Sequence, residues 1–180
     1  MVDKVVITGV GMISSVGNDR EATWQAVCAG RSGVRRMTNL LGFSGDTLLG
    51  ATVSDLDIEA GDTRYGPLGL QAAEEALRDS QLELSRVNLD RFACAISPNV
   101  GDTPGIANLR TKDLKEKSYE PWCNRFLPNS TCSLIANRFD LNGPRLSHSA
   151  ACASGTASTL GALRAIQSNQ CDLALVGCAQ

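Results

Sequence analysis

The sequence is poor in the side chains that bind metals in clusters, which limits the kinds of site it can form. It has one histidine, His148, and its seven cysteines include no Cys-x-x-Cys pair, so nothing indicates a zinc site. No run of about 18 apolar residues occurs, so no transmembrane helix is expected, and the first residues lack the layout of a signal peptide. A net charge of -2 gives no basic field that would attract nucleic acid.

The composition that is present suits one folded domain. Apolar residues make up 43% of the 180 residues, which is enough for a sizeable core and argues against disorder. The odd number and scattered spacing of the cysteines indicate reduced thiols in a cytoplasmic protein. Gly9 and Gly11 resemble the start of a dinucleotide-binding motif, but Ser14 stands where the third glycine belongs, so no nucleotide cofactor is expected.

Short β-type runs alternate with helix-forming runs along the chain, and this order predicts an α/β fold with a mainly parallel sheet. In one predicted helix, Glu74 and Glu75 fall on the polar face, and we expect them to be solvated rather than to act as an acid/base pair. The predicted strands cover residues 5–8, 51–53, 92–97, 145–149 and 173–176, and the predicted helices cover residues 19–29, 67–80, 105–117, 128–139 and 153–166.

The most informative segment surrounds Cys152, in the run Ser-Ala-Ala-Cys-Ala-Ser-Gly-Thr over residues 149–156. A β-type run leads into it and a helix-forming run leads out, so the thiol is predicted at or just before a helix N-terminus. The unpaired N–H groups and the positive end of the helix dipole at such a place favour a thiolate and can hold a developing oxyanion. Most cysteines are small buried hydrophobes, but the small neighbours here leave room for a substrate to reach the sulfur. Cys152 is therefore the candidate catalytic nucleophile.

Several ordered motifs carry one resemblance. The motifs are Val-Val-Ile-Thr-Gly-Val-Gly-Met-Ile-Ser-Ser-Val-Gly at 5–17, Asn-Gly-Pro at 142–144, Ala-Cys-Ala-Ser-Gly at 151–155 and Cys-Asp-Leu-Ala-Leu-Val-Gly at 171–177. They resemble the opening strand, the entry to the nucleophile strand, the nucleophile turn and the following strand of β-ketoacyl-acyl-carrier-protein synthases, the condensing enzymes of the thiolase superfamily. The resemblance spans essentially the whole chain. It is closest to the bacterial elongating synthases, because Ser154 and Gly155 follow the cysteine.

The resemblance implies a thiolase-like α/β fold, of which residues 1–180 would form the N-terminal half, with the C-terminal half absent. That half is a mixed, mainly parallel sheet layered with helices. The resemblance also implies that Cys152 accepts an acyl group for decarboxylative Claisen condensation with a malonyl thioester, in fatty acid or polyketide biosynthesis. The implied partners are acyl carrier protein, the acyl and malonyl thioesters, and a ketosynthase-like chain in a homo- or heterodimer. No cofactor and no metal are implied.

The family decarboxylates its substrate with two histidines and a lysine, from motifs that this sequence does not contain. His148 lies four residues before Cys152, roughly 13 Å along a straight strand, and is interpreted as a structural or interface residue. We therefore expect the isolated chain to be inactive, with the histidines supplied by a partner chain or by the missing half. Two alternatives stay open. One is a non-catalytic interaction subunit, and the other is a self-contained acyltransferase or hydrolase that uses His148 as its base.

Overall fold

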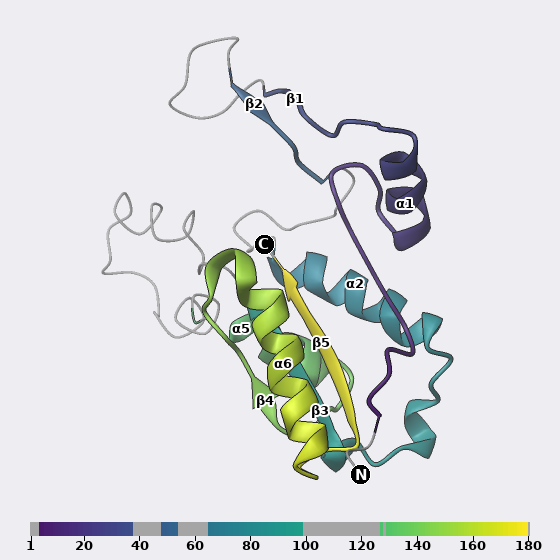
Figure 1. Ribbon diagram of the computed structural model, residues 1–180, viewed down its shortest axis with the longest axis vertical. Coiled ribbons are helices and arrows are strands. Elements are labelled where there is room, and N and C mark those ends of the chain that lie inside the picture. The colour runs from purple at the N-terminus through teal and green to yellow at the C-terminus, as the bar shows by residue number, and fades with distance from the viewer. Residues whose placement is uncertain (1–3, 38–47, 54–64, 99–126, 128, 180) are drawn as a thin grey trace, which may run out of the picture.

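A three-stranded parallel sheet forms the centre of the protein (Figure 1). Its strands lie in the order β4 (Arg145–Leu146), β3 (Phe92–Pro98) and β5 (Leu173–Ala179). β3 and β5 pair in register from Phe92 opposite Leu173 to Pro98 opposite Ala179, so the prediction of a parallel sheet is confirmed. The structure, a computed structural model, describes residues 4–37, 48–53, 65–98, 127 and 129–179.

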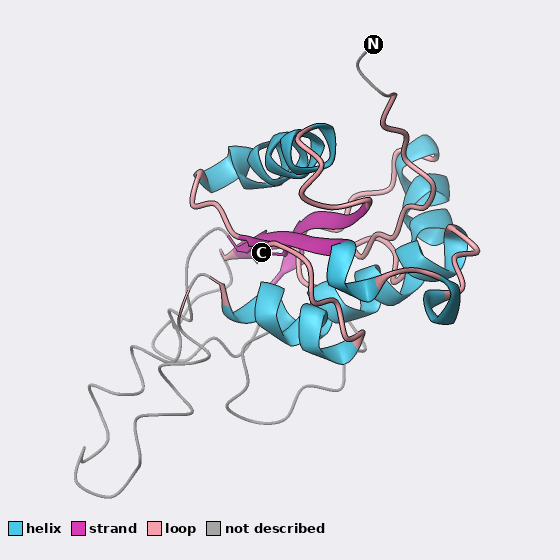
Figure 2. Ribbon diagram, turned by 90° about the horizontal axis from the view of Figure 1, so that it is seen from below, coloured by secondary structure: helices cyan, strands magenta, loops and turns pink. Residues whose placement is uncertain are grey.

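Helices cover both faces of this sheet, which gives three layers (Figure 2). α6 (Ser154–Gln167) packs on one face, and α2 (Tyr65–Asp79) and α5 (Ser130–Arg138) pack on the other. All seven residues of β3 are buried, as expected for a central strand whose two faces are both covered. Successive side chains of β3 alternate between the two faces, so Cys94 joins the core beneath α2 and α5 while Ala93 packs toward α6.

The N-terminal third adds a helix and a small hairpin to the layered body (Figure 1). α1 (Arg20–Cys28) begins where predicted, because the Asp19 carboxylate accepts a 2.6 Å hydrogen bond from the Ala22 N–H and caps the helix. The strand predicted at 51–53 is wrong, since the ladder lies two residues earlier. The remaining elements of the described residues are β1 (Arg35–Arg36) and β2 (Leu49–Gly50), which pair antiparallel, and the single-turn 3-10 helices η1 (Leu84–Arg86), η2 (Leu89–Arg91) and η3 (Ala151–Ala153).

The buried strand predicted at residues 5–8 is also wrong. This segment has no strand pairing, and its side chains face solvent, with Val6 72% and Ile7 83% exposed. The physical reason is that this N-terminal segment runs beside α2, where Gly9 and Gly11 pass close to the helix backbone, and not along an edge of the sheet. A β-type run that lacks a hydrogen-bonding edge remains extended without becoming a strand.

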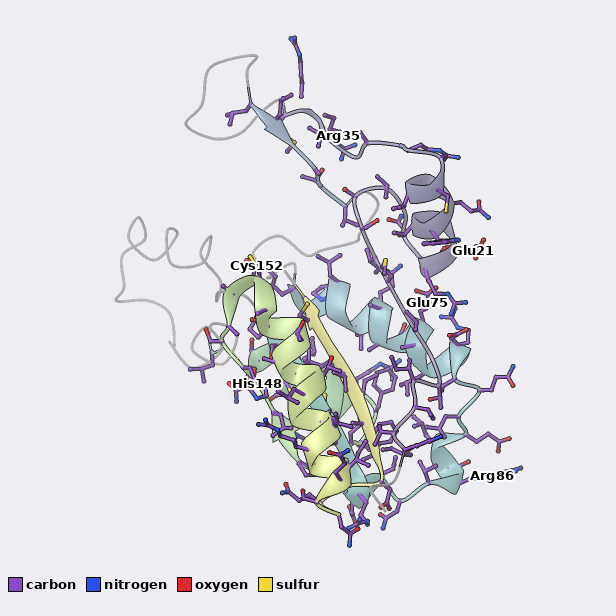
Figure 3. The ribbon with its side chains drawn as sticks, viewed as in Figure 1. Glu21, Arg35, Glu75, Arg86, His148 and Cys152 are labelled. Carbon is purple, nitrogen blue, oxygen red and sulfur yellow. The ribbon has the colours of Figure 1, made fainter. Side chains whose placement is uncertain are left out.

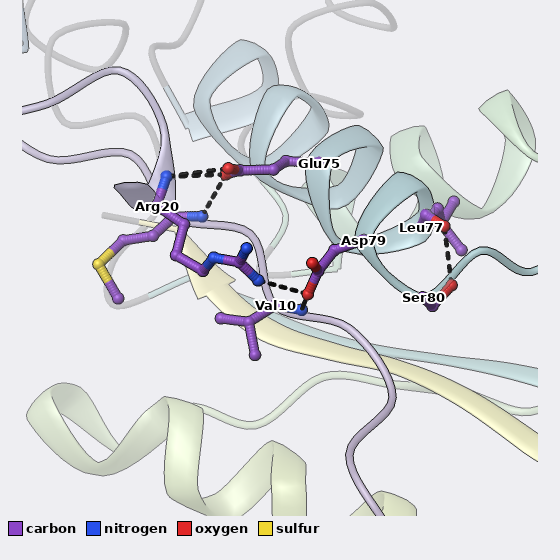
Figure 4. Close-up of polar contacts among 7 residues, drawn as sticks. Val10, Arg20, Glu75, Leu77, Asp79 and Ser80 are labelled. Carbon is purple, nitrogen blue, oxygen red and sulfur yellow. Dashed lines mark hydrogen bonds and ion pairs between the residues drawn. The ribbon is translucent and has the colours of Figure 1, made fainter. Parts of the chain in front are cut away.

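Two carboxylates of α2 bind this N-terminal segment instead (Figure 4). Glu75 accepts hydrogen bonds from the backbone N–H groups of Met12, at 2.8 Å, and Arg20, at 2.9 Å. Asp79 accepts one from the Val10 N–H at 2.9 Å and also pairs with the Arg20 guanidinium. Residues four apart on a helix share one face, so the two carboxylates act together. The expectation that Glu75 is merely a solvated residue is therefore wrong.

The Asp79 contact should make the docking of this segment sensitive to acid. The N–H of Val10 and the guanidinium of Arg20 hold the pKa of Asp79 below its usual range. A lowered folded pKa means that the stabilisation is present above the unfolded value of about 3.9 and is lost as pH falls through the folded value. We expect hydrogen-exchange protection of the Val10 amide to disappear in that acid window. Asp79→Ala should lose the protection already at neutral pH, while Glu74→Ala should keep it; equal protection in both variants would contradict the assignment.

Not all of the other predicted helices lie within the residues that the structure describes. α2 begins two residues before its predicted start, with Pro67 in its first turn, and α5 begins two residues after its predicted start. The helix predicted at 105–117 lies outside the described residues. Within the described part of the chain, no helix is both long and apolar enough to cross a membrane.

Candidate active site

Cys152 lies in the 3-10 turn η3, directly before the first residue of α6, and its side chain is exposed (Figure 3). The preceding residue, Ala151, has φ of +48°, a left-handed conformation that a residue with a Cβ seldom adopts. This turn reverses the chain between β4 and α6 and leaves Cys152 at the beginning of the helix. The predicted position of the thiol, at or just before a helix N-terminus, is where the structure has it.

The N-terminus of α6 has no side-chain cap. Ala153 occupies the cap position and has no polar side-chain atom, while the Ser154 hydroxyl accepts a 3.1 Å hydrogen bond from the N–H of Ala150. Within the turn, the N–H of Ala153 donates to the carbonyl of Ala150 at 3.0 Å, and the N–H of Ser154 donates to the carbonyl of Ala151. No side chain caps the N–H groups that follow in α6, and the helix dipole adds positive potential at the same place. This arrangement suits an anion or a developing oxyanion close to the Cys152 sulfur.

A buried hydroxyl pair fixes α6 on the sheet. The hydroxyls of Ser97 on β3 and Ser158 on α6 are 2.5 Å apart, and both residues are completely buried. The Ser97 hydroxyl also accepts a 2.8 Å hydrogen bond from the backbone N–H of His148, in the segment that follows β4. One serine thus connects the central strand, the helix that begins at Cys152 and the chain that leads into the cysteine turn.

Ser97→Ala should destabilise the fold because it leaves the buried Ser158 hydroxyl and the partly buried His148 N–H without their partner. An unsatisfied buried group costs about 1–3 kcal/mol, so we expect a loss of about 2 kcal/mol or more, measured by urea denaturation. Ser158→Ala removes only one of these contacts and should cost less. A Ser97→Ala protein as stable as Ser158→Ala would contradict the central role of the Ser97 hydroxyl.

His148 does not reach the candidate nucleophile. Its ring lies against Gly161, where an added Cβ would come within 2.8 Å of the ring carbon Cε1. Gly161 is nine residues beyond Cys152, roughly 13 Å along a helix, and Figure 3 shows the two labelled side chains well separated. The ring borders a cavity of about 230 Å³ between β4 and α6, and its Nδ1 is buried without a hydrogen-bond partner among the described residues. This placement does not support His148 as the base of a self-contained hydrolase.

The described cysteines separate into a buried and an exposed group. Cys94 and Cys132 face one another across β3 and α5, and the hydrogen bond with Cys132, together with burial, raises the pKa of Cys94, which keeps it protonated. Burial likewise raises the pKa of Cys171. The exposed thiols are Cys28, Cys152 and Cys178, and all six described cysteines are free.

No cluster of three possible metal ligands occurs among the described residues. Nucleophilic chemistry by a thiol needs an exposed sulfur near an oxyanion site. Of the exposed cysteines, Cys152 lies in the turn before α6, one residue before the cap position Ala153, whereas Cys28 ends α1. The site residue predicted from the sequence is thus placed where such chemistry is possible.

The class of protein is given by a family model. The model described as "Beta-ketoacyl synthase, N-terminal domain" matches residues 2–54 and 63–180. Because this match covers far more than half of the chain, the protein belongs to the β-ketoacyl synthase family, through the N-terminal domain of that family.

Individual relatives agree. The 3-oxoacyl-[acyl-carrier-protein] synthases 2 of Coxiella burnetii and Vibrio cholerae are 30% and 31% identical to this chain, over 97% and 98% of its length. The chain spans 45% of each of these relatives. Among solved structures, the ishigamide ketosynthase/chain length factor superposes with a TM-score of 0.79 at 27% identity, covering 97% of this chain and 47% of that one. A β-ketoacyl synthase from Burkholderia phymatum superposes with a TM-score of 0.75 at 26% sequence identity, covering 92% of this chain and 44% of that one. These findings confirm the thiolase-like α/β fold and its N-terminal half.

Proposed function

We propose that this chain is the nucleophile-bearing half of a ketosynthase, with Cys152 as the residue that accepts the acyl group. The observation that carries the proposal is the exposed Cys152 thiol directly before the uncapped N-terminus of α6, in a chain of the β-ketoacyl synthase family. The Cys152 thiolate attacks the carbonyl carbon of a carrier-bound acyl thioester, and a tetrahedral intermediate forms. Its oxyanion accepts hydrogen bonds from backbone N–H groups at the turn, including that of Cys152. The carrier thiolate then leaves, and the acyl group stays on the cysteine.

The second half of the reaction joins this acyl group to a malonyl unit. The malonyl thioester loses carbon dioxide, and the resulting carbanion attacks the acyl-cysteine carbonyl, which forms the new carbon–carbon bond and releases the Cys152 thiolate. Protein groups that assist decarboxylation need to reach the malonyl carboxylate. His148 lies against the middle of α6, so we propose that the two histidines come from a partner chain or from further sequence of the same protein.

The proposed partners are an acyl carrier protein and a ketosynthase-like chain. One solved neighbour is a type II polyketide acyl-carrier protein in complex with its ketosynthase, and another is a ketosynthase in complex with its chain length factor. At 22% and 18% identity these neighbours share the fold, and their complexes suggest which partners to seek. Whether the acyl chain belongs to a fatty acid or a polyketide depends on the pocket that such a partner completes.

The native mass of the protein, purified gently from its own cells, tests the proposal. We expect a complex with a polypeptide that carries two histidines, and transfer of an acyl group from a carrier thioester to Cys152 within that complex, located by peptide mass mapping. A mass of 19.0 kDa, or a multiple built from this chain alone, together with failure to acylate, would contradict the proposal. It would favour the non-catalytic interaction subunit, which the single histidine also favours.

A further inference from the structure

A second exposed thiol, Cys178, lies on the face of β5 that α6 covers. Side chains of a strand alternate between its two faces, so even-numbered residues of β5 share one face. Ala174 packs against the cluster that contains Ala165 of α6, whereas Leu175 joins the core on the opposite side of the sheet. Cys178 is four residues after Ala174, so it lies on the same face of β5 and points toward α6. It is also close to the carboxyl end of β5, the end at which α6 begins (Figure 1).

The Cys178 sulfur contacts the first turn of α6 at Gly155. A Cβ added to Gly155 would lie 3.0 Å from the Cys178 sulfur, so the absence of a side chain at this position leaves space for the thiol. Cys152 precedes Gly155 by three residues, and residues three apart in a 3-10 or α-helical turn lie on the same side, with about 5–6 Å between their Cβ positions. The Cys178 thiol thus lies one helical turn from Cys152, and no side chain at Gly155 separates them.

Both thiols are accessible to a small oxidant. Cys152 and Cys178 are exposed, whereas Cys94, Cys132 and Cys171 are buried. The third exposed thiol among the described cysteines, Cys28, lies at the end of α1 and supplies a matched control. A nucleophilic cysteine with a neighbouring exposed thiol has the arrangement from which a sulfenic acid can be converted to a disulfide before further oxidation.

We propose that Cys178 is a resolving thiol for Cys152 and that a peroxide drives the two into a reversible disulfide. The Cys152 thiolate attacks one oxygen of the peroxide, and the O–O bond breaks, which gives a sulfenic acid and hydroxide. The Cys178 thiolate then attacks the Cys152 sulfur, the S–O bond breaks, and the oxygen leaves as hydroxide, which takes a proton from the solvent to become water. Two electrons pass from the thiols to the peroxide, and a dithiol reductant returns them. The inference rests on the proposed role of Cys152 as the reactive thiol, and the disulfide would block acyl transfer while it lasts.

In the test, the reduced protein, together with any partner that copurifies, is treated with hydrogen peroxide. Free thiols are then alkylated, and the products are mapped by mass spectrometry. We expect a peptide pair cross-linked between Cys152 and Cys178 and full recovery of the Cys152 thiol after dithiothreitol. In Cys178→Ser and Cys178→Ala the cross-link should be absent, and irreversible sulfinic acid at Cys152 should rise by about fivefold or more. Cys28→Ser should behave as the wild type.

The outcomes separate the inference from the proposed function. If Cys152 is acylated and alkylated readily but forms no disulfide with Cys178, the resolving role is overturned while the nucleophile stands. If Cys178→Ser shows no more irreversible oxidation than the wild type, the resolving role is again overturned. If Cys152 reacts with neither an acyl thioester nor an alkylating agent in the native complex, both the inference and the proposed function fail.

Discussion

Cys152→Ala should abolish acyl transfer to the protein, with a loss of at least about a thousandfold in the rate, because the alanine has no atom that can form the thioester. The fold should be unaffected, since the side chain is exposed and makes no buried contact that would be lost. The measurement is the mass increase of the protein after incubation with an acyl carrier thioester in the native complex. Cys28→Ala is the matched control, because it removes an exposed thiol from α1 and should leave acyl transfer unchanged.

The same variant distinguishes the two leading functions. If Cys152→Ala is expressed in place of the natural chain and the pathway product disappears, the chain supplies the nucleophile. Unchanged product formation would indicate the interaction subunit, in which the cysteine is dispensable. Cys152→Ser refines the result, because a hydroxyl at this position keeps the shape of the turn but is a far weaker nucleophile at neutral pH.

Gly11→Ala should detach the N-terminal segment from α2. A Cβ at this position would lie 1.9 Å from the carbonyl oxygen of Ala72, and one at Gly9 would lie 2.2 Å from that of Ala76. Backbone atoms of a helix cannot move aside as the end of a flexible side chain can, so the segment has to shift and the hydrogen bonds to Glu75 are broken. We expect a loss of about 1–3 kcal/mol in the free energy of unfolding, measured by urea denaturation.

Gly177→Ala is the control for this substitution, because its added Cβ would meet Ile96 at 3.5 Å, an ordinary contact. Limited proteolysis gives a second readout, since a detached segment at residues 4–13 becomes cleavable while the sheet remains intact. A Gly11→Ala protein with wild-type stability and an uncleaved N-terminus would show that the segment does not need its close approach to α2.

The sequence was most informative where local pattern and tertiary setting agree. The apolar run at the start of β3 predicted a buried strand, and the β-type and helix-forming runs on either side of Cys152 predicted a thiol at the start of a helix; both predictions depend on residues adjacent in the chain. Residues 5–8 have an equally good β pattern, but whether a strand forms there depends on whether the segment lies along a sheet edge. In the structure the segment instead lies against α2, which is far along the chain, so its own residues could not reveal this.

The contacts that the sequence did not reveal are long-range ones. Glu75 and Asp79 read as surface residues of an amphipathic helix, and only the passage of the N-terminal segment beside α2 gives their carboxylates backbone partners. Cys178 lies beyond the strand predicted at 173–176, and its proximity to the cysteine turn follows from the packing of α6 on β5 at Gly155. The alternation of side chains along β5 is enough to place Cys178 on the face covered by α6, but it does not reveal which turn of α6 lies beside Cys178.

The pairing of β3 with β5 also has a consequence for the order of events during synthesis. Phe92 is paired with Leu173, so β3 leaves the ribosome 81 residues before β5, the strand with which it forms its longest ladder. At bacterial or eukaryotic elongation rates this interval is about 4 to 16 seconds. During that time β3, which is apolar except for Ser97, lacks its β5 partner, and only the two-residue β4 can pair with one of its edges before the interval ends. A holdase that binds extended apolar segments would therefore have its main opportunity at residues 92–98, before the nucleophile turn has been translated.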